Sequence, residues 1–68
     1  MKKYNVTVSN KLLSEDRIVP VTAKSAQDAH KEMLFGELTE YDEITEIRNE
    51  DGVLVYGTEG FVNVYRDA

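Results

Sequence analysis

Apolar and polar residues alternate in two stretches near the start of the chain. Tyr4, Val6 and Val8 fall on one face of an extended segment, with polar residues between them. A period of two that is rich in β-branched residues is typical of a half-buried strand, so we predict a strand over residues 3–9. Residues 17–23 repeat the pattern and predict a second strand, paired with the first as a hairpin across a polar connection.

The second predicted strand contains Pro20. Because proline has no N–H group, it cannot donate to the hydrogen-bond ladder of a sheet. We therefore expect this strand to lie at a sheet edge, or Pro20 to face away from its neighbour. The side chains expected to face inward are Val19, Val21 and Ala23.

Helical spacing replaces the alternation after Ser25. The Ser25 hydroxyl is placed to cap the first turn of a helix, and Asp28 follows three residues later, where an acidic side chain suits the helix N-terminus. Gly36 predicts the point where this helix ends. The residues that recur on one face, and are expected to pack against the sheet, are Ala26, Ala29, His30, Met33 and Leu34.

The last third of the chain predicts three more strands. Residues 43–48 have an irregular pattern, because Ile44 and Ile47 are three positions apart and would face opposite sides of a regular strand. A bulge, or burial on both sides, would reconcile the two isoleucines. The remaining turn signals lie at residues 49–52 and 57–60, and the remaining strands are expected over residues 53–56 and 61–65.

Together these elements predict a single α+β domain over residues 1–68, in the order β-β-α-β-β-β. An antiparallel β-sheet with one helix packed on one face would bury the apolar side of every predicted element.

Few residues offer catalytic or metal-binding chemistry. The chain has no cysteine, a single histidine (His30) and no phosphate-binding glycine motif. A histidine at the margin of a packed helix face is usually structural. The carboxylates of residues 40–46 are of the type that binds Mg²⁺ or Ca²⁺, but their spacing does not match a calcium-binding loop. We therefore predict no enzymatic activity, no cofactor and no metal site.

The charge narrows the class of partner. The formal net charge is −5, whereas nucleic-acid binding depends on lysine and arginine contacts to phosphates. We expect no direct contact with nucleic acid, and a basic or nucleic-acid-binding protein as the partner. Because the sequence contains neither an apolar run long enough to cross a membrane nor a signal-peptide pattern, we expect a cytoplasmic protein without a membrane partner.

The acidic residues are concentrated in one segment. Residues 1–36 carry six basic and four acidic side chains, whereas residues 37–51 carry seven acidic side chains against Arg48 alone. Such a block either keeps a small domain soluble and prevents aggregation at strand edges, or docks a basic surface and selects the partner. In the second interpretation the carboxylates imitate phosphates, as in a DNA mimic. The predicted partner-binding residues are Glu37, Glu40, Tyr41, Asp42, Glu43, Glu46, Glu50 and Asp51.

Aromatic side chains suggest another use of the surface, because tyrosine is favoured in interface hot spots. The aromatic residues considered for this role are Tyr4, Tyr41, Tyr56, Phe61 and Tyr65. Phe61 and Tyr65 share one face of the last predicted strand, and this face is either part of the core or exposed. If it is exposed, that face or a free sheet edge would make the chain a structural or self-assembling module, with a homodimer as the product.

The stretch R-I-V-P-V-T-A-K-S-A-Q-D-A over residues 17–29 resembles a segment of small phage-encoded inhibitor proteins, among them the short RNA polymerase inhibitor of podophages. Small acidic anti-CRISPR and anti-restriction proteins share the general format. The resemblance implies an inhibitor or modulator of a host nucleic-acid-handling protein, active in the host cytoplasm and acting through an acidic surface rather than by catalysis. The chain departs from the polymerase inhibitor in its long β-rich C-terminal segment, and no functional residue carries over.

Overall fold

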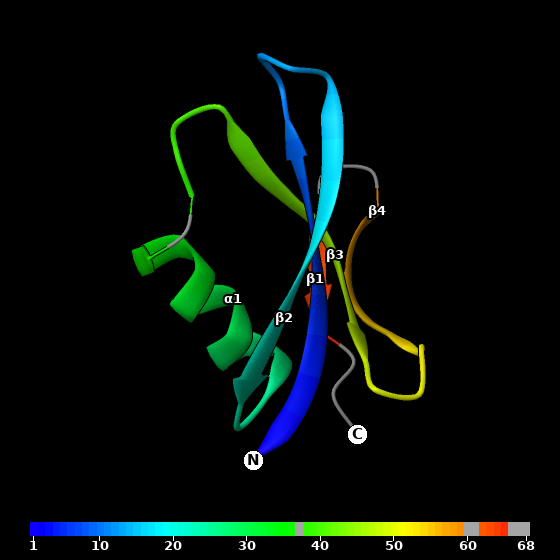
Figure 1. The fold of residues 1–68 in the computed structure, drawn as a ribbon. Helices are drawn as coiled ribbons and strands as arrows, with labels where there is room; N and C mark the ends of the chain where they lie inside the picture. Colours follow the sequence, from blue (N-terminus) through cyan, green and yellow to red (C-terminus); the bar gives the residue numbers. More distant parts are fainter. Residues whose placement is uncertain (37, 60–61, 66–68) are drawn as a thin grey trace.

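A twisted antiparallel sheet with one helix on one face forms the framework of the protein (Figure 1). The computed structural model describes residues 1–36, 38–59 and 62–65, with side chains described for residues 1–36 and 38–57. The elements are β1 (Lys2–Asn10), β2 (Glu15–Ala23), α1 (Ala26–Gly36), β3 (Asp42–Asn49), β4 (Leu54–Glu59) and β5 (Val62–Tyr65). The predicted α+β class, with an antiparallel sheet and one packed helix, is confirmed.

The strands lie side by side in the order β2-β1-β3-β4-β5, and every pair of neighbours is antiparallel. α1 therefore carries the chain from the edge strand β2 across the face of β1 to β3, and it contacts all three strands. β2 is an edge strand, as the proline in its middle predicts. Pro20 pairs with Asn5 on its inner side, and among the described residues no strand lies beside the outer side of β2.

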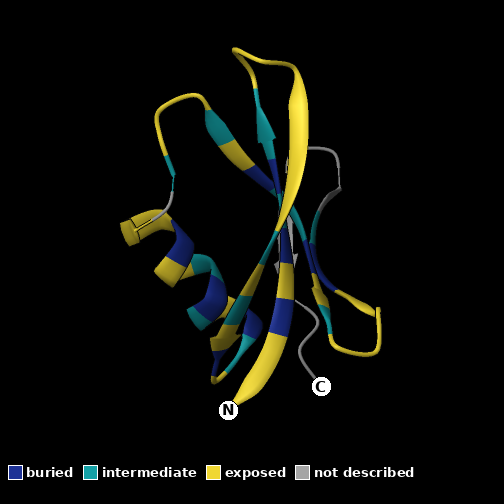
Figure 2. Cartoon of the chain, viewed as in Figure 1, coloured by how far each residue is buried: buried dark blue, intermediate teal, exposed yellow. Residues whose placement is uncertain are grey.

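The core includes residues of α1 and of the four strands β1 to β4, with β1 at its centre. Tyr4, Val6 and Val8 of β1 are buried, as the alternation predicts, and the intervening residues face the other side of the sheet (Figure 2). Val6 pairs with Val19 of β2 and with Ile47 of β3, so that three branched side chains meet on the helix side. Contacts of this kind between neighbouring strands are the main source of sheet stability.

A bulge in β3 accounts for the irregular spacing of its isoleucines. Thr7 pairs with Glu46 and Val8 pairs with Ile44, so Thr45 has no opposite residue in β1. The extra residue brings Ile44 and Ile47 to the same face, where both are buried. The bulge proposed from the sequence is confirmed.

α1 meets the sheet through a narrow face. The Ser25 hydroxyl accepts a hydrogen bond from the Asp28 N–H group at 3.2 Å, which confirms the predicted cap. The helix buries Ala26, Ala29 and Met33. The prediction for Leu34 is wrong, because its side chain is 59% exposed; it lies about 100° around the helix from Met33, beyond the edge of this narrow contact.

The glycines differ in their roles. Gly52 adopts a φ of 81°, which confirms the turn between β3 and β4. Gly57 was expected in a turn, but it lies inside β4, which starts at Leu54 and continues to Glu59. A Cβ atom at Gly57 would stand 3.5 Å from Cδ2 of Leu54, which is an ordinary van der Waals distance, so packing against that leucine does not require glycine here. Gly60 and Phe61 lie outside the described residues.

Candidate functional site

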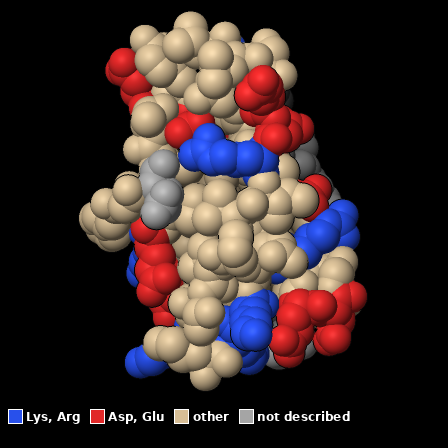
Figure 3. Space-filling model, viewed as in Figure 1, with Lys and Arg blue, Asp and Glu red and all other residues tan. Residues whose placement is uncertain are grey.

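The acidic segment does not form one continuous surface. Glu40 to Glu43 lie where the chain enters β3, whereas Glu50 and Asp51 lie in the turn that follows it. Residues 44–49 of β3 separate the two groups, which places Glu43 and Glu50 about 20–23 Å apart. Acidic residues accordingly gather near both ends of the molecule in Figure 3. Glu46 lies in the middle of β3, and Glu37 lies outside the described residues.

Asp42 is the centre of a hydrogen-bond network rather than a free acidic group. Its Oδ1 accepts hydrogen bonds from Asn10 Nδ2 at 2.8 Å and from Arg17 at 3.2 Å. Its Oδ2 accepts hydrogen bonds from the Thr39 N–H group at 3.0 Å and from the Thr39 hydroxyl at 3.1 Å. The side chain is only 2% exposed, so its carboxylate is already occupied inside the molecule and is not presented to a partner.

These contacts shift the ionisation of Asp42. The Arg17 guanidinium, followed by the Thr39 N–H group and the Asn10 amide, holds the pKa of the Asp42 carboxyl well below its ordinary value of 3.8. Every one of these donors stabilises the charged form. The carboxylate therefore stays ionised throughout the physiological range and keeps all of its partners.

The Asp42 network fixes the end of the sheet that lies farthest from the N-terminus. It joins β1 through Asn10, β2 through Arg17 and the α1–β3 connection through Thr39. In addition, the Lys11 N–H group donates a hydrogen bond to the Tyr41 carbonyl at 2.8 Å. The β1–β2 loop and the α1–β3 connection are thereby held side by side.

Among the described residues, the other acids of the segment form exposed ion pairs or no ion pair. Glu43 lies 3.7 Å from Lys11 Nζ, and Glu46 lies 2.6 Å from Arg48 Nε. Exposed pairs of this kind contribute little to stability and leave the carboxylates accessible. Within the described part of the chain, no ion pair involves Glu40, Glu50 or Asp51. The accessible negative charge is therefore smaller than the sequence indicates, and it is distributed over two sites.

The β1–β2 loop adds an apolar surface that lies outside the predicted partner-binding residues. Leu12 and Leu13 are 68% and 63% exposed, and the exposed Tyr41 belongs to the adjoining connection. We call Leu12, Leu13, Glu40, Tyr41 and Glu43 the tip surface. In Figure 3 uncharged atoms cover this end, with acidic groups on both sides. The signal in the sequence was a pair of leucines inside a short polar loop, where neither has a strand face to bury.

The leucines are carried by an ordered loop. The Asn10 Oδ1 atom accepts a hydrogen bond from the Leu13 N–H group at 2.8 Å, which closes a turn of the type that asparagine favours. Ser14, the last residue of the loop, has a φ of 53°. This left-handed conformation is unfavourable for a residue with a side chain.

Replacing Ser14 by glycine is expected to stabilise the protein by about 0.5–1 kcal/mol, since glycine adopts this backbone conformation without steric conflict. The Ser14→Ala variant is the matched control and should gain no stability, because alanine keeps the Cβ atom that makes the left-handed conformation unfavourable. Urea denaturation followed by circular dichroism measures both. An equal gain in the two variants would contradict a backbone origin of the effect.

His30 has a structural environment. Its ring meets Tyr56 edge to face with 4.7 Å between ring centroids, and burial lowers the pKa of His30 below its usual value. The hollow beside it is lined by Leu34, Leu38, Asp42, Glu43, Ile44 and Tyr56. No group of three or more histidine, aspartate or glutamate side chains is arranged to hold a metal ion among the described residues.

The aromatic residues separate into core and surface. Tyr4 and Tyr56 are buried, which removes them from the set considered for an interface, and Tyr41 remains accessible. The side chains of Phe61 and Tyr65 lie outside those described, so their use of one strand face or the other stays a prediction. Phe35, which was not in that set, is 89% exposed.

In comparisons with known proteins, no family model, curated protein or solved structure matches this chain. In the described part of the chain, no helix has the length and apolar character needed to cross a membrane.

Proposed function

We propose that the chain is a protein-binding module that contacts its partner through the tip surface. The observation that carries this proposal is the pair of neighbouring leucines, each more than 60% exposed, on a loop held by hydrogen bonds from both sides. Exposed apolar patches rimmed by polar residues mark protein interaction sites. A surface that is already ordered also loses little conformational freedom on binding.

The chemistry of the tip surface defines the partner. Leu12, Leu13 and the Tyr41 ring would enter an apolar cleft, while Glu40 and Glu43 would face basic residues at its border. Such basic borders are common on proteins that handle nucleic acids, which makes a host protein of that class the proposed target. Inhibition or modulation by occupying the target's surface, as in small phage-encoded inhibitors, is the proposed mode of action.

Substitution of Leu12 and Leu13 by serine is expected to weaken partner binding at least about tenfold, because removal of the central apolar contacts of an interface usually has effects of this size. Glu40→Gln with Glu43→Gln should weaken it less, and mainly at low salt. Affinity capture from a bacterial lysate identifies the partner, and titration with the purified partner at two salt concentrations measures the effect.

Glu50→Gln with Asp51→Asn is the matched control, since it removes the same charge from the opposite end of β3. Asp42 is left intact in all variants because its loss would disturb the fold of the tip. If the serine variant bound the captured partner as tightly as the unmodified protein, the tip surface would not be the interface. If only the control variant lost binding, the interface would lie at Glu50 and Asp51 instead of the tip surface.

Self-assembly through a sheet edge remains the alternative, and one observation favours it. Ile18 is an exposed apolar residue on the free edge strand β2. Pro20 and the charged residues at the start of β2 oppose this use, because both features hinder the addition of another strand. The Ile18→Thr variant tests it: edge pairing predicts a weaker dimer for this variant.

A further inference from the structure

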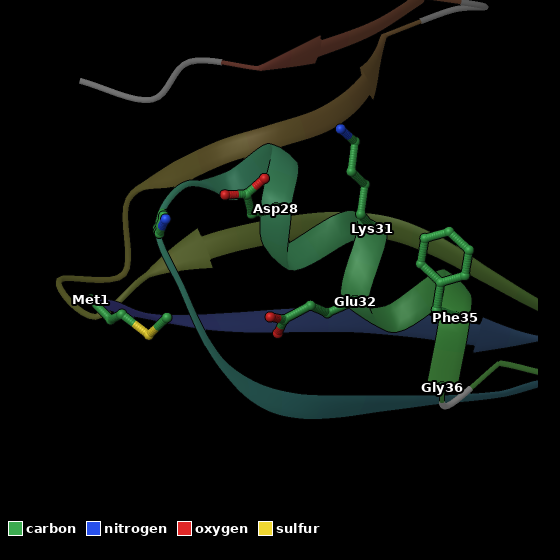
Figure 4. A pocket seen from close by; sticks show the side chains of 7 residues that line it. Met1, Asp28, Lys31, Glu32, Phe35 and Gly36 are labelled. Atoms are coloured by element: carbon green, nitrogen blue, oxygen red, sulfur yellow. The ribbon is translucent and has the colours of Figure 1, made fainter.

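The outer face of α1 carries a second surface, separate from the tip. Asp28, Lys31, Glu32 and Phe35 recur at helical spacing on the side opposite the buried alanines (Figure 4). Phe35 is 89% exposed, although its ring is among the most apolar groups of the chain. A hollow of about 440 Å³ extends along this face towards Met1 and Lys24, which lie beyond the first turn.

The charges on this face are arranged in two columns. On a helix with about 100° between residues, Lys31 lies about 40° to one side of Phe35, whereas Asp28 and Glu32 lie about 20° and 60° to its other side. Phe35 thus separates a basic column, which consists of Lys31 alone, from an acidic column formed by Asp28 and Glu32. Within the described residues, neither Lys31 nor Glu32 forms an ion pair.

We propose that this face binds a second copy of the chain, with the two α1 helices side by side and parallel. A two-fold axis along the helices would place the basic column of one copy against the acidic column of the other. Lys31 would then meet Glu32 of the second copy, twice, and the two Phe35 rings would pack together near the axis. A surface that pairs with itself must be self-complementary in this way.

The arrangement of charges also excludes the opposite orientation. In an antiparallel pair each column would face its own copy, so that Lys31 would lie beside Lys31 and Glu32 beside Glu32. Like charges in such positions are strongly unfavourable. The parallel pair is the orientation in which the exposed aromatic ring is covered while Lys31 and Glu32 approach their opposite charges. Asp28, which lies about 20° from Phe35, comes close to Asp28 of the second copy in this arrangement, which is a further reason to expect a weak dimer.

The expected dimer is weak and leaves the proposed binding function intact. A helix of eleven residues offers less area than the roughly 800 Å² per partner of a standard interface. We therefore expect dimers only at high protein concentration. Because the axis runs along the helices, both tip surfaces would project towards the same end, uncovered and available to a partner.

Sedimentation equilibrium over a wide concentration range tests the proposal through charge reversal. Lys31→Glu and Glu32→Lys should each weaken the dimer at least about tenfold, since each places like charges in both contacts. A mixture of these two variants should form a heterodimer, and the variant with both changes should recover the homodimer. Phe35→Ala should also weaken it about tenfold.

Ile18→Thr is the control and should leave this dimer unchanged. Far-ultraviolet circular dichroism confirms that each variant is folded. An unmodified protein that stays monomeric at millimolar concentration would overturn the proposal, and so would a mixture of charge variants that fails to associate. A dimer weakened by Ile18→Thr alone would assign the contact to the edge of β2. None of these outcomes bears on the tip surface, whose test measures a different partner.

Discussion

Met33→Ala is expected to lower the free energy of unfolding by about 2–4 kcal/mol, the usual range for removing a long apolar side chain from a core. Met33 is the one large side chain among the three residues that α1 buries, and the other two are alanines. A chain of 68 residues has a total stability of only about 3–10 kcal/mol. At the lower end of that range, the loss would leave a substantial fraction of the molecules unfolded.

Leu34→Ala provides the matched control, because it removes a side chain of similar size from the next position on the same helix. With 59% of its surface exposed, Leu34 should contribute less than about 0.5 kcal/mol, as exposed positions usually do. Urea denaturation followed by circular dichroism measures both variants. If the Met33→Ala and Leu34→Ala variants lost equal free energy of unfolding, α1 would not pack through the face that contains Ala26, Ala29 and Met33.

Asp42→Asn is expected to lower the melting temperature by several degrees at neutral pH, because it removes the charge that organises Asn10, Arg17 and Thr39. The variant keeps the shape of the side chain, but its amide nitrogen cannot accept the hydrogen bonds now made to one oxygen. Glu43→Gln is the control. Its exposed pair with Lys11 at 3.7 Å should contribute little.

The Asp42 effect should depend on pH with a defined sign. The folded-state pKa lies well below the ordinary value of 3.8, so the unfolded chain takes up the proton first as the pH falls. The stabilisation is fully present above that value and is lost as the pH drops towards the folded pKa. Melting curves of the unmodified protein and of Asp42→Asn should converge between pH 4 and pH 2. If the difference in melting temperature between the two proteins stayed constant across that range, the stabilisation would not come from the charge of Asp42.

The local patterns in the sequence predict most of the fold. The alternation around Tyr4, Val6 and Val8 identifies the central strand, and the conflict between Ile44 and Ile47 identifies the bulge. Both depend only on which face of a short segment is apolar. Leu34 shows the limit of this reasoning: helical spacing alone does not reveal how wide the contact between α1 and the sheet is.

The candidate site was harder to predict because its decisive contacts join distant parts of the chain. Asp42 and Asn10 are 32 positions apart, and nothing in the acidic segment itself indicates that one of its carboxylates is enclosed. The other acids of the segment fall into two groups because β3 extends between Glu43 and Glu50. Leu12 and Leu13 gain importance only when the loop that carries them is seen beside Tyr41.

The strand order has a consequence for how the protein is made. Of the five described strands, β1 is synthesised before the others, yet its final place is between β2 and β3. Its hairpin with β2 can form early, but the other edge of β1 must wait for residues 42–49, more than thirty positions later. During that interval the apolar face of Tyr4, Val6 and Val8 is covered incompletely. The nascent chain therefore depends on the arrival of β3 to close its core, and chains truncated before that strand should aggregate rather than fold.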